Sequence, residues 1–561
     1  MTKDSLVKGT LILTVAALIA RFLGVFQRIP LVYLLGDEGM GSYTIAFNLY
    51  STLLVIATAG IPSALSKLIS EKTELGRQAE ADKIYRAAAL FALVAGVIMA
   101  VLLYILAPFY AHGISGDPNA VLATRAIAPA LLFFPMIAIM RGYFQGRQNM
   151  MPNGISQVIE QIIRIITAVG FAVLLLNVSL EWAVAGASFG GVTGGFAALF
   201  IMMYFARKLR REDRKGSSRN AQTARNQMAA MGYKPIHSNR VESLSYSRIY
   251  IDLLKLSIPI VIFSITVTFI YNIDSSIIIR LLGDKLGDKV ALNLVGILGG
   301  RAQSLAGLPI ILAIALSQSV VPIISAAFSR KDLKQVGHQT SRVLQLAILS
   351  GLPMVLVISI AARPIDWFIF GYEDSSYGLA HGPYMISLLT ISAMFQIVMQ
   401  TSGAVLMGMG RMKLLMISVA VGVAVKLAGS YLLAPSTGIY GIIASTGLCF
   451  MVMSWMNLRD LRKVVNFRIL GNRWSGLLLS IAIIAGAGSG VEWLTHNYVH
   501  LFGNRIDEGI RAVLVSGVVL GLYPLLLIMT RVVTKEDVES FPKPLQKLIA
   551  KSARLLKRSN S

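Results

Sequence analysis

Residues 10–35 read TLILTVAALIARFLGVFQRIPLVYLL, an almost unbroken apolar run near the start of a chain of 561 residues. A helix that crosses the hydrocarbon core of a bilayer needs about 20 mostly apolar residues, and this run is long enough. A lipid-facing backbone has no water to bond to, so the run is predicted to be helical. Arg21 interrupts it and no small-residue cleavage site follows, so we expect a retained membrane span rather than a signal peptide.

Runs of the same kind recur along the whole chain and predict fourteen membrane spans. The composition agrees, because 55% of the residues are apolar and only 14% are charged, against about 25% charged in soluble domains. We therefore predict an all-α polytopic membrane protein. The predicted spans are 10–35, 41–66, 87–111, 121–140, 153–176, 183–206, 250–282, 301–328, 343–371, 383–409, 412–434, 438–458, 474–496 and 509–530.

The positive charge is distributed unevenly among the predicted loops. The chain has 52 Lys and Arg against 28 Asp and Glu, a net charge of +24. Cytoplasmic loops of membrane proteins are rich in Lys and Arg, so the alternation predicts a multi-pass protein of the cell membrane with both termini in the cytoplasm. Only Lys285, Lys289 and Arg505 break the pattern on the outer side. The basic loops are 67–86, 207–248, 329–342 and 459–473, and the loops without Lys or Arg are 36–41, 112–120, 177–182, 372–382 and 435–437.

A basic chain also raises the question of nucleic acid, but the basic segments lack the interleaved aromatic residues that stack on bases. We therefore expect the phospholipid bilayer, and no nucleic acid, as the partner of these charges.

Cys449 is the only cysteine, which excludes an internal disulfide and a cysteine metal site. The six histidines show no HxxxH or HExxH spacing, so we expect no metal and no cofactor.

The two halves of the chain resemble each other. Gly146 precedes Arg164 by eighteen positions, and Gly408 precedes Lys426 by the same number. A looser match joins Pro62 in AGIPSALS to Pro322 in SVVPIISA. We predict two pseudo-symmetric six-helix bundles with a substrate cavity between them, followed by two C-terminal helices. The predicted domains are a first bundle at 1–206, a flexible basic cytoplasmic linker at 207–248, a second bundle at 249–458, the two extra helices at 459–531 and a basic cytoplasmic tail at 532–561.

Two arginines within the first span have no acid beside them in the same helix. Arg21 and Arg28 are seven residues apart, which places them on one helix face roughly 10 Å apart along the axis. Inserting an arginine at the membrane centre costs roughly 2.5–3.5 kcal/mol on insertion scales, so each of the two requires a partner group, an aqueous cavity or a route to the membrane surface. One hypothesis is an anionic substrate whose phosphate oxygens match the guanidinium groups. The other is that acids on different helices, such as Asp274, neutralise them.

Other charges also lie within predicted spans. Glu160 and Arg164 are four residues apart and are predicted to pair along their own helix. Arg164 and its repeat counterpart Lys426 remain candidates for substrate contact. Asp274 and Glu160 are the candidates for coupling to Na⁺ or H⁺, or for charge compensation, and dependence on the membrane potential stays open as well.

Two stretches resemble a known family. Residues 141–165, RGYFQGRQNMMPNGISQVIEQIIRI, are similar to the fourth-to-fifth-helix signature of the polysaccharide-transporter branch of the MOP exporter superfamily. Within that branch they look most like the YtgP and stage V sporulation protein B group, which contains MurJ-type lipid II flippases. The segment ARFLGVFQR, residues 20–28, resembles the first helix of the MurJ flippases and places Arg21 on the first family arginine.

The resemblance implies a V-shaped bundle whose cationic cavity accepts undecaprenyl-pyrophosphate-linked sugars. It implies that Arg21, Arg28 and Arg301 contact the pyrophosphate, and that the last two helices form a groove for the prenyl tail. The family also carries an arginine in the second helix, where this chain has Leu53, Leu54 and Val55. That departure leaves open a lipid-linked substrate other than lipid II.

These observations favour a flippase for a lipid-linked cell-wall precursor, in the first place lipid II, working by alternating access and not as an enzyme. Cell-wall synthesis proteins are further expected partners. The alternatives are an exporter of another lipid-linked oligosaccharide (a teichoic acid, capsule or spore-cortex precursor), a multidrug or cation antiporter and a non-transporting scaffold. A glycosyltransferase with Asp37 and Glu38 as its acidic pair is disfavoured, because the loop GDEGMG is too short to build an outer domain.

Overall fold

The computed structural model describes residues 6–74, 77–230, 245–371, 376–498 and 503–533. Within these ranges every regular element is a helix, and no strand occurs. Twelve helical segments are long and apolar enough to cross a membrane. The protein is therefore an all-α, multi-pass membrane protein, as its sequence predicts. The predicted tail lies outside the described residues from residue 534 onward.

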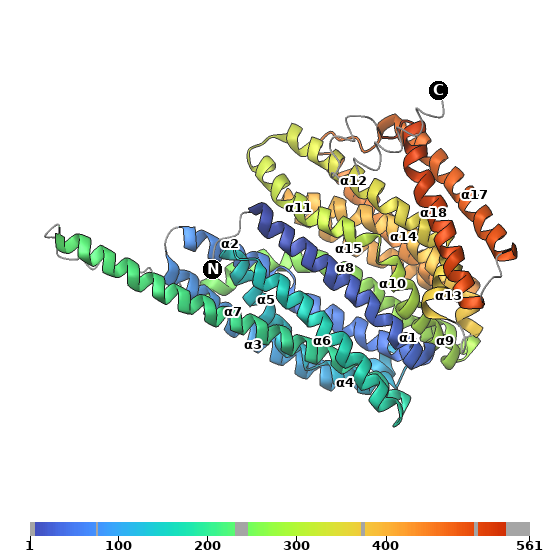
Figure 1. Cartoon of the computed structure of the whole chain (residues 1–561), viewed down its shortest axis with the longest axis horizontal. Coiled ribbons are helices and arrows are strands. Elements are labelled where there is room, and N and C mark those ends of the chain that lie inside the picture. The colour runs from blue at the N-terminus through green and yellow to red at the C-terminus, as the bar shows by residue number, and fades with distance from the viewer. Residues whose placement is uncertain (1–5, 75–76, 231–244, 372–375, 499–502, 534–561) are drawn as a thin grey trace. The chain divides into compact units, whose positions relative to one another are not determined.

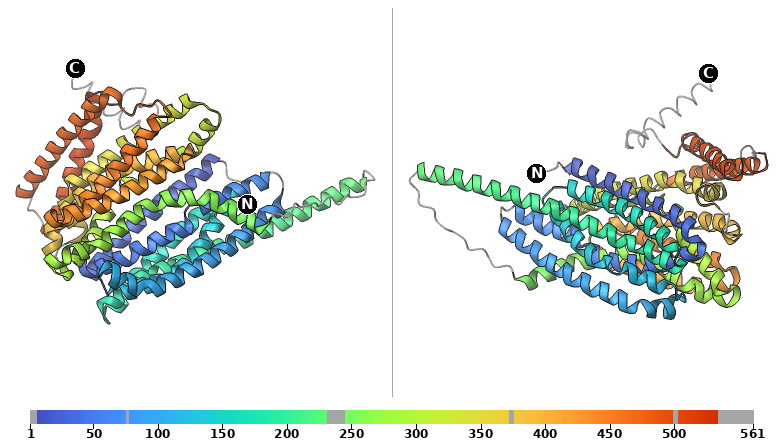
Figure 2. Two further views of the ribbon diagram at one scale, coloured as in Figure 1. Left: turned by 180° about the vertical axis from the view of Figure 1, so that it is seen from behind. Right: turned by 60° about the horizontal axis from the view of Figure 1, so that its bottom comes forward.

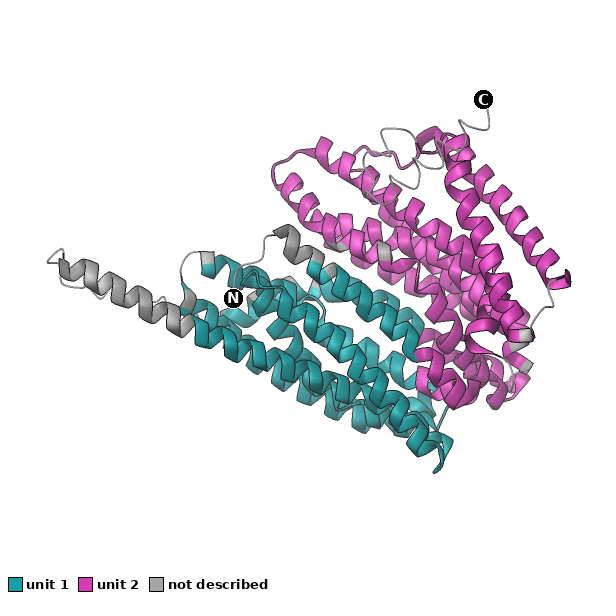
Figure 3. Ribbon diagram, in the orientation of Figure 1, with its two compact units in different colours: residues 1–27, 45–272 teal, residues 28–44, 273–561 magenta. Residues whose placement is uncertain are grey.

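The chain forms two compact units (Figure 3). Unit 1 contains residues 1–27 and 45–272, and unit 2 contains residues 28–44 and 273–561. The division runs through two helices, α1 (Leu6–Thr58) and α8 (Tyr246–Leu286), so each unit includes a part of both. The domain boundaries drawn from the sequence stay a prediction.

Helix α1 contains the apolar run 10–35 and continues beyond it. Gly36 has φ 61° and ψ −176°, a backbone conformation that glycine adopts and residues with a Cβ avoid. Residues on both sides of Gly36 are helical, so the predicted loop 36–41 is a kink within α1. Pro30 lies in the same helix, six residues before the kink.

Unit 1 contains two groups of closely packed helices (Figure 1). Helix α6 lies along α7, and α5 packs against α2 and α3. Small side chains such as Ala88 and Ala92 are fully buried between α3 and its neighbours, which lets membrane helices approach closely. Besides its parts of α1 and α8, the unit contains α2 (Ile61–Glu74), α3 (Gln78–Pro108), the π-helical η1 (Phe109–Ser115), α4 (Ala120–Ile127), α5 (Ala130–Gly146), α6 (Met151–Leu176) and α7 (Leu180–Ala230).

The predicted linker is partly helical. Residues 207–230 belong to α7, and residues 231–244 lie outside the described part of the chain.

Helix α3 has two different faces. The face opposite its buried alanines carries large exposed apolar side chains, among them Leu93, Val97 and Ile105. A face of this kind is expected to contact lipid rather than water.

Unit 2 has α14 at its centre, packed against α11, α12 and α16. Helices α17 and α18 lie side by side in every view (Figures 1 and 2). The unit contains α9 (Asp288–Gly296), the π-helical η2 (Ile297–Ala302), α10 (Gln303–Ala306), α11 (Ile310–Ser329), α12 (Leu333–Ile360), α13 (Ala362–Phe370), α14 (Ser376–Gly408), α15 (Met412–Thr437), α16 (Ile439–Arg462), η3 (Gly471–Arg473), α17 (Trp474–Tyr498) and α18 (Asn504–Met529).

The predicted count of fourteen spans is not confirmed, and two places account for the difference. The predicted spans 10–35 and 41–66 fall within one candidate segment, Val15–Thr73, although Gly36 has non-helical φ and ψ and separates two helices within α1. The predicted span 301–328 is broken into η2, α10 and α11. What remains of it as an apolar helix, Ala313–Ser329, is shorter than the other spans.

The resemblance between the two halves extends to helix packing. In unit 1, a Cβ added at Gly146 of α5 would clash with Ser66 and Ile69 of α2. In unit 2, a Cβ added at Gly408 of α14 would press on Val321 and Ile324 of α11. Gly146 lets α5 approach α2, and Gly408, at the matching position of the second half, lets α14 approach α11.

The predicted match between Pro62 and Pro322 does not share this register. Ser66, which contacts the first glycine, follows Pro62 by four residues, whereas Val321 directly precedes Pro322. The two prolines therefore occupy different places relative to the glycine contact.

Candidate functional site

Arg21 and Arg28 lie on the same continuous part of α1, before the kink. Arg21 belongs to unit 1 and is exposed, and it makes no hydrogen bond or ion pair with any residue in the described ranges. Arg28 belongs to unit 2 and is half-buried, and its guanidinium donates a hydrogen bond to the carbonyl oxygen of Gly299 in η2. The cavity that was predicted to unite these two arginines stays a prediction.

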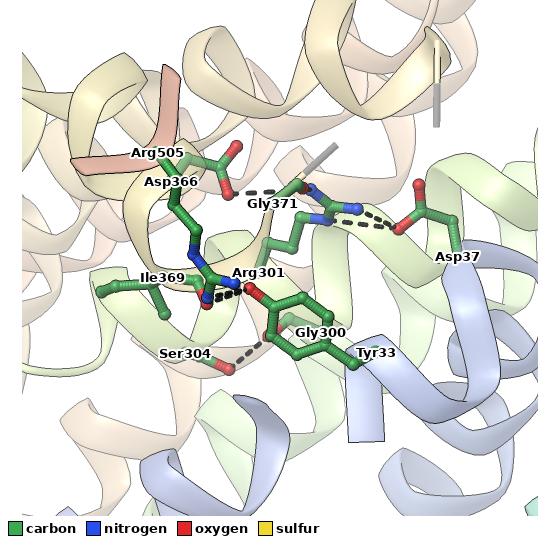
Figure 4. A network of polar contacts seen from close by, with 9 residues as sticks. All are labelled: Tyr33, Asp37, Gly300, Arg301, Ser304, Asp366, Ile369, Gly371 and Arg505. Atoms are coloured by element: carbon green, nitrogen blue, oxygen red, sulfur yellow. Dashed lines mark hydrogen bonds and ion pairs between the residues drawn. The ribbon is translucent and has the colours of Figure 1, made fainter. Parts of the chain in front are cut away.

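Arg301, the third arginine implied in substrate contact, is buried in unit 2 among protein groups (Figure 4). Its Nη2 and Nε lie 2.8 and 3.2 Å from Oδ1 of Asp37 in α1. Its Nη1 donates to the carbonyl oxygen of Gly371 at 3.1 Å, and Oδ1 of Asp366 in α13 is 4.0 Å away. Two carboxylates thus neutralise Arg301 in this structure, and its contact with substrate stays a prediction.

A second set of contacts lies next to Arg301 (Figure 4). Arg505 of α18 donates from Nη2 to the hydroxyl of Tyr33 at 2.5 Å and from Nε to the carbonyl oxygen of Phe368 at 3.2 Å. The Tyr33 hydroxyl in turn donates to the carbonyl oxygen of Ile369 at 2.9 Å. Arg505 therefore links the first and last described helices of the chain to α13.

Asp274 and Lys426 form a fully buried ion pair in unit 2. Lys426 of α15 also donates from Nζ to the carbonyl oxygen of Ile442 at 2.7 Å. The hydroxyl of Thr446 in α16 donates to Oδ2 of Asp274 at 3.1 Å. Asp274, which the alternative hypothesis assigned to neutralise Arg21 and Arg28, is thus engaged by a lysine, and its role in ion coupling stays a prediction.

Glu160 is the acid of a similar cluster in unit 1, where the predicted pair with Arg164 is present at 3.3 Å. A second arginine, Arg141 of α5, lies 3.0 Å from the other carboxylate oxygen of Glu160. The Arg164 guanidinium also lies over the ring of Phe134, 5.7 Å from its centre. One carboxylate therefore holds two arginines, and the sequence analysis had singled out only one of them.

The acidic pair Asp37–Glu38 is divided between two cations. Asp37 binds Arg301, and Glu38 lies 3.0 Å from Lys289. In the described part of the chain no group of three or more His, Cys, Asp or Glu residues could hold a metal ion. The geometry gives no support to a pair of acids that bind a metal or activate an acceptor.

Three charged residues of unit 2 that form ion pairs were not predicted from the sequence. Asp366 approaches Arg301 from α13, and no local pattern in the sequence links two residues so far apart. Glu508 and Arg511 of α18 pair at 2.6 Å, and Arg511 also lies 3.1 Å from Nδ1 of His496. The spacing of three residues between Glu508 and Arg511 was a visible signal for that pair.

These observations define a polytopic α-helical membrane protein that buries ion pairs between its spans. The chain belongs to the polysaccharide biosynthesis protein family, whose family model matches residues 6–328, more than half of its length. A second family model, MatE, matches residues 259–432. The resemblance to the MOP superfamily is thereby confirmed.

Two relatives from Bacillus subtilis (strain 168) are similar to the chain over nearly its whole length. Lipid II flippase MurJ is 26% identical over 536 residues, which cover 92% of this chain and 93% of the relative. Stage V sporulation protein B is 26% identical over 549 residues, which cover 97% and 98%.

Solved structures show the same fold. The inward closed conformation of lipid II flippase MurJ matches with a TM-score of 0.63 at 15% identity and covers 92% of this chain and 100% of the other. An inward-facing multidrug resistance MATE family transporter of the MOP superfamily matches with a TM-score of 0.61 at 13% identity. That match covers 82% of this chain and 100% of the transporter.

Proposed function

We propose that this protein is a flippase that moves a lipid-linked cell-wall precursor, in the first place lipid II, across the cytoplasmic membrane by alternating access. The similarity to lipid II flippase MurJ over 92% of the chain supports the class of transporter. The termini are proposed to lie in the cytoplasm, and cell-wall synthesis proteins are proposed as partners.

The observation that carries the proposal is the environment of Arg21. This arginine lies in a membrane-spanning helix, is exposed, and has no ion pair among the described residues. A guanidinium in a low-dielectric surrounding gains strongly from an anion, and its planar fork matches two phosphate oxygens. A substrate with a pyrophosphate group would supply that anion, and its lipid tail would keep it in the membrane.

Another lipid-linked oligosaccharide would use the same chemistry. Stage V sporulation protein B is as similar to the chain as MurJ is, at 26% identity. The pyrophosphate and the prenyl tail are shared by such precursors, so the intramembrane arginines do not distinguish their sugars. A teichoic acid, capsule or spore-cortex precursor is therefore the second candidate substrate.

A multidrug or cation antiporter is the second candidate class, because the MatE family model matches residues 259–432. A cationic substrate requires a carboxylate that can receive it. Three of the acids buried in the described spans lie against cations: Glu160 against two arginines, Asp274 against Lys426 and Glu508 against Arg511. This arrangement favours an anionic cargo.

The protein is not an enzyme, because the relatives and structures that it resembles are flippases and transporters. We propose no cofactor. If transport is coupled to Na⁺ or H⁺, Asp274 and Glu160 are the acids through which we propose that coupling acts. Lys426 and Arg164 stay proposed substrate contacts for a state of the protein in which their present partners have moved away.

Native mass spectrometry of the purified protein with competing lipids tests the proposal. We expect lipid II to be retained in preference to phosphatidylglycerol, and Arg21→Ala to remove that preference. Arg86→Ala is the matched control, because Arg86 is exposed on α3 and forms no hydrogen bond or ion pair with a described residue. Equal retention of the two lipids by the wild-type protein would contradict the proposed function.

A further inference from the structure

Helices α8, α15 and α16 of unit 2 bring oxygen atoms together around the ammonium group of Lys426. Its Nζ contacts Oδ1 of Asp274 in α8 and donates to the carbonyl oxygen of Ile442 in α16 at 2.7 Å. The hydroxyl of Thr446 lies beside both partners, because it donates to Oδ2 of Asp274 at 3.1 Å and is 3.3 Å from the carbonyl oxygen of Ile442. A carboxylate, a main-chain carbonyl and a hydroxyl thus gather next to one positive charge.

This group of contacts is closed to solvent. Lys426 and Thr446 are 0% exposed and Asp274 is 2% exposed, and all three lie in helices that can span the membrane. Water therefore does not screen the carboxylate, and leaving it without a cation at this place would be costly. The site requires a positive charge, and in this structure the chain itself provides it.

One further oxygen lies close to this level without a partner. Ser430 follows Lys426 by one turn of α15, is fully buried, and its hydroxyl makes no hydrogen bond with any described residue. A Cβ added at Gly429 would lie 2.9 Å from Oγ of Ser445, so this part of α15 packs on the turn of α16 that contains Ile442 and Ser445. A buried hydroxyl without a partner is uncommon, and an additional ligand for a cation would explain it.

Carboxylate, hydroxyl and carbonyl oxygens are also the groups that bind hard cations such as Na⁺. We propose that α8, α15 and α16 form a binding site for a monovalent cation, and that the ammonium of Lys426 occupies it as a tethered cation. The oxygen ligands of the site are those of Asp274, Ser430, Ile442 and Thr446.

The tethered cation changes what the site can do. While the ammonium is in place, Na⁺ has no free position at Asp274, and the carboxylate stays neutralised at every Na⁺ concentration. Coupling of transport to a free cation through Asp274 therefore requires that Lys426 leaves first. The inference goes beyond the proposed function and holds whichever lipid the protein carries.

Thermal unfolding of the full-length protein in detergent tests the inference, with NaCl compared with N-methyl-D-glucamine chloride at the same ionic strength. Lys426→Ala removes the ammonium and opens space beside the carboxylate. Its unfolding midpoint is expected to be low in the bulky salt and to rise in NaCl, because Na⁺ then fills the site. Propylammonium, which has the atoms that the substitution deletes, should raise it as well. The wild type should unfold at the same temperature in both salts, since its site is already filled.

Two variants separate the loss of charge from the opening of space. Lys426→Met loses the same charge but fills the space, so its midpoint is expected to be low in both salts. Asp274→Asn, added to Lys426→Ala, removes the charged ligand. The NaCl concentration that gives half of the rescue should then rise roughly tenfold, the equivalent of one charge-assisted interaction.

Ser430 provides a test that a purely structural ion pair does not predict. Added to Lys426→Ala, Ser430→Ala is expected to raise the NaCl concentration for half of the rescue by about threefold, because a neutral ligand is lost. Ser418→Ala is the matched control on the same helix. Ser418 is also buried, but its hydroxyl donates to the carbonyl oxygen of Leu415 at 2.9 Å, two turns before Lys426, and its loss should leave the rescue unchanged.

Equal midpoints of Lys426→Ala in the two salts would overturn the inference, because the vacated oxygens would then show no preference for a small cation. An equal rise in NaCl for the wild type and for Lys426→Ala would also overturn it, since Na⁺ would then act elsewhere. If Lys426→Ala does not fold, Lys426→Gln takes its place, because glutamine is uncharged and one atom shorter than lysine. Failure of the wild type to bind lipid II would contradict only the proposed function, because unfolding is measured without lipid II.

Discussion

Lys426 and Asp274 show what a charged residue requires inside a membrane protein. Lys426 is fully buried, and its ammonium is surrounded by a carboxylate and a main-chain carbonyl oxygen. Such a pair contributes little net stability, because the desolvation of two charges offsets most of their attraction. Removing one partner is a different matter, since the other charge is then buried without compensation.

Lys426→Met is therefore expected to destabilise the protein by about 3–5 kcal/mol, and the double variant Lys426→Met with Asp274→Leu to recover most of that loss. Thermal unfolding in detergent measures both. A double variant as unstable as the single one would show that the pair holds the helices together by its charges.

Arg21 provides the second test at the scale of a single residue. In a strain depleted of its own flippase, the Arg21→Ala variant is expected not to support growth. The Arg21→Lys variant is expected to support growth in part, because lysine keeps the charge but lacks the planar guanidinium that binds two oxygens. Membrane levels of each variant are measured alongside. Full growth of the alanine variant at normal levels would remove Arg21 from the site.

The three cations that break the loop-charge pattern each have a specific partner. Lys285 donates to the carbonyl oxygen of Pro435 at 2.8 Å, and Lys289 lies 3.0 Å from Glu38. Arg505 binds Tyr33 and Phe368. Each positive charge that departs from the predicted loop pattern thus has a contact within unit 2. The position of these residues in the sequence does not predict those contacts.

At the scale of the helix, glycine decides how closely α5 approaches α2. A Cβ added at Gly142 would lie 2.7 Å from the carbonyl oxygen and 2.8 Å from the Cα of Pro62, both backbone atoms that cannot move aside alone. Gly170 of α6 is also helical, but a Cβ added there meets nothing within 4 Å.

Gly142→Ala is expected to lower the stability of the protein by about 1–3 kcal/mol through overpacking. Gly170→Ala is expected to leave it unchanged or to raise it by about 0.5–1 kcal/mol, since alanine favours the helix over glycine. Unfolding in detergent compares the two. Equal stability of both variants would mean that α2 and α5 can move apart without lowering the free energy of unfolding.

Helix α1 shows where apolar patterning reaches its limit. The sequence predicts two spans with a loop at 36–41, and both apolar runs are helical. The loop is replaced by a kink at Gly36, because a single glycine with positive φ can turn the backbone between two helices that follow each other directly. A run of apolar residues reports that a helix forms, but not whether two runs are joined by a loop or by a kink.

At the scale of the whole molecule, the remaining question is topology. If α11 crosses the membrane despite its shortness, Asp284 and Lys334 lie on opposite sides. Both residues are exposed, and Cys449, the only cysteine, is buried and can be replaced first. We expect a cysteine at Asp284 to react with a membrane-impermeant thiol reagent in intact cells, and one at Lys334 to react only after lysis.

Asn177 provides the reference position for this labelling, because it is exposed, lies in a loop predicted to be outside and precedes α11. A cysteine there should react in intact cells. Labelling of Asp284 and Lys334 from the same side would mean that α11 does not cross, and the predicted orientation of every later loop would then invert.

The candidate site was predictable in part. The pair Glu160–Arg164 follows from a spacing of four residues, because such residues share one face of a helix. Arg141 did not follow, although it lies only nineteen residues before Glu160. Its contact depends on how α5 and α6 pack, and a spacing across a turn between two helices does not specify their rotation.

Local patterns in the sequence establish that the chain is helical, that it resides in a membrane and where most of its spans lie, because hydrogen bonding and hydrophobicity in a bilayer act on each local segment. They also show which charges are unusual. The partners of these charges follow from the folded structure alone. Arg301 finds Asp37 across 264 residues, and Lys426 finds Asp274 on another helix. Such a choice depends on which helix faces pack together, and helix packing arises from the whole fold rather than from any local pattern.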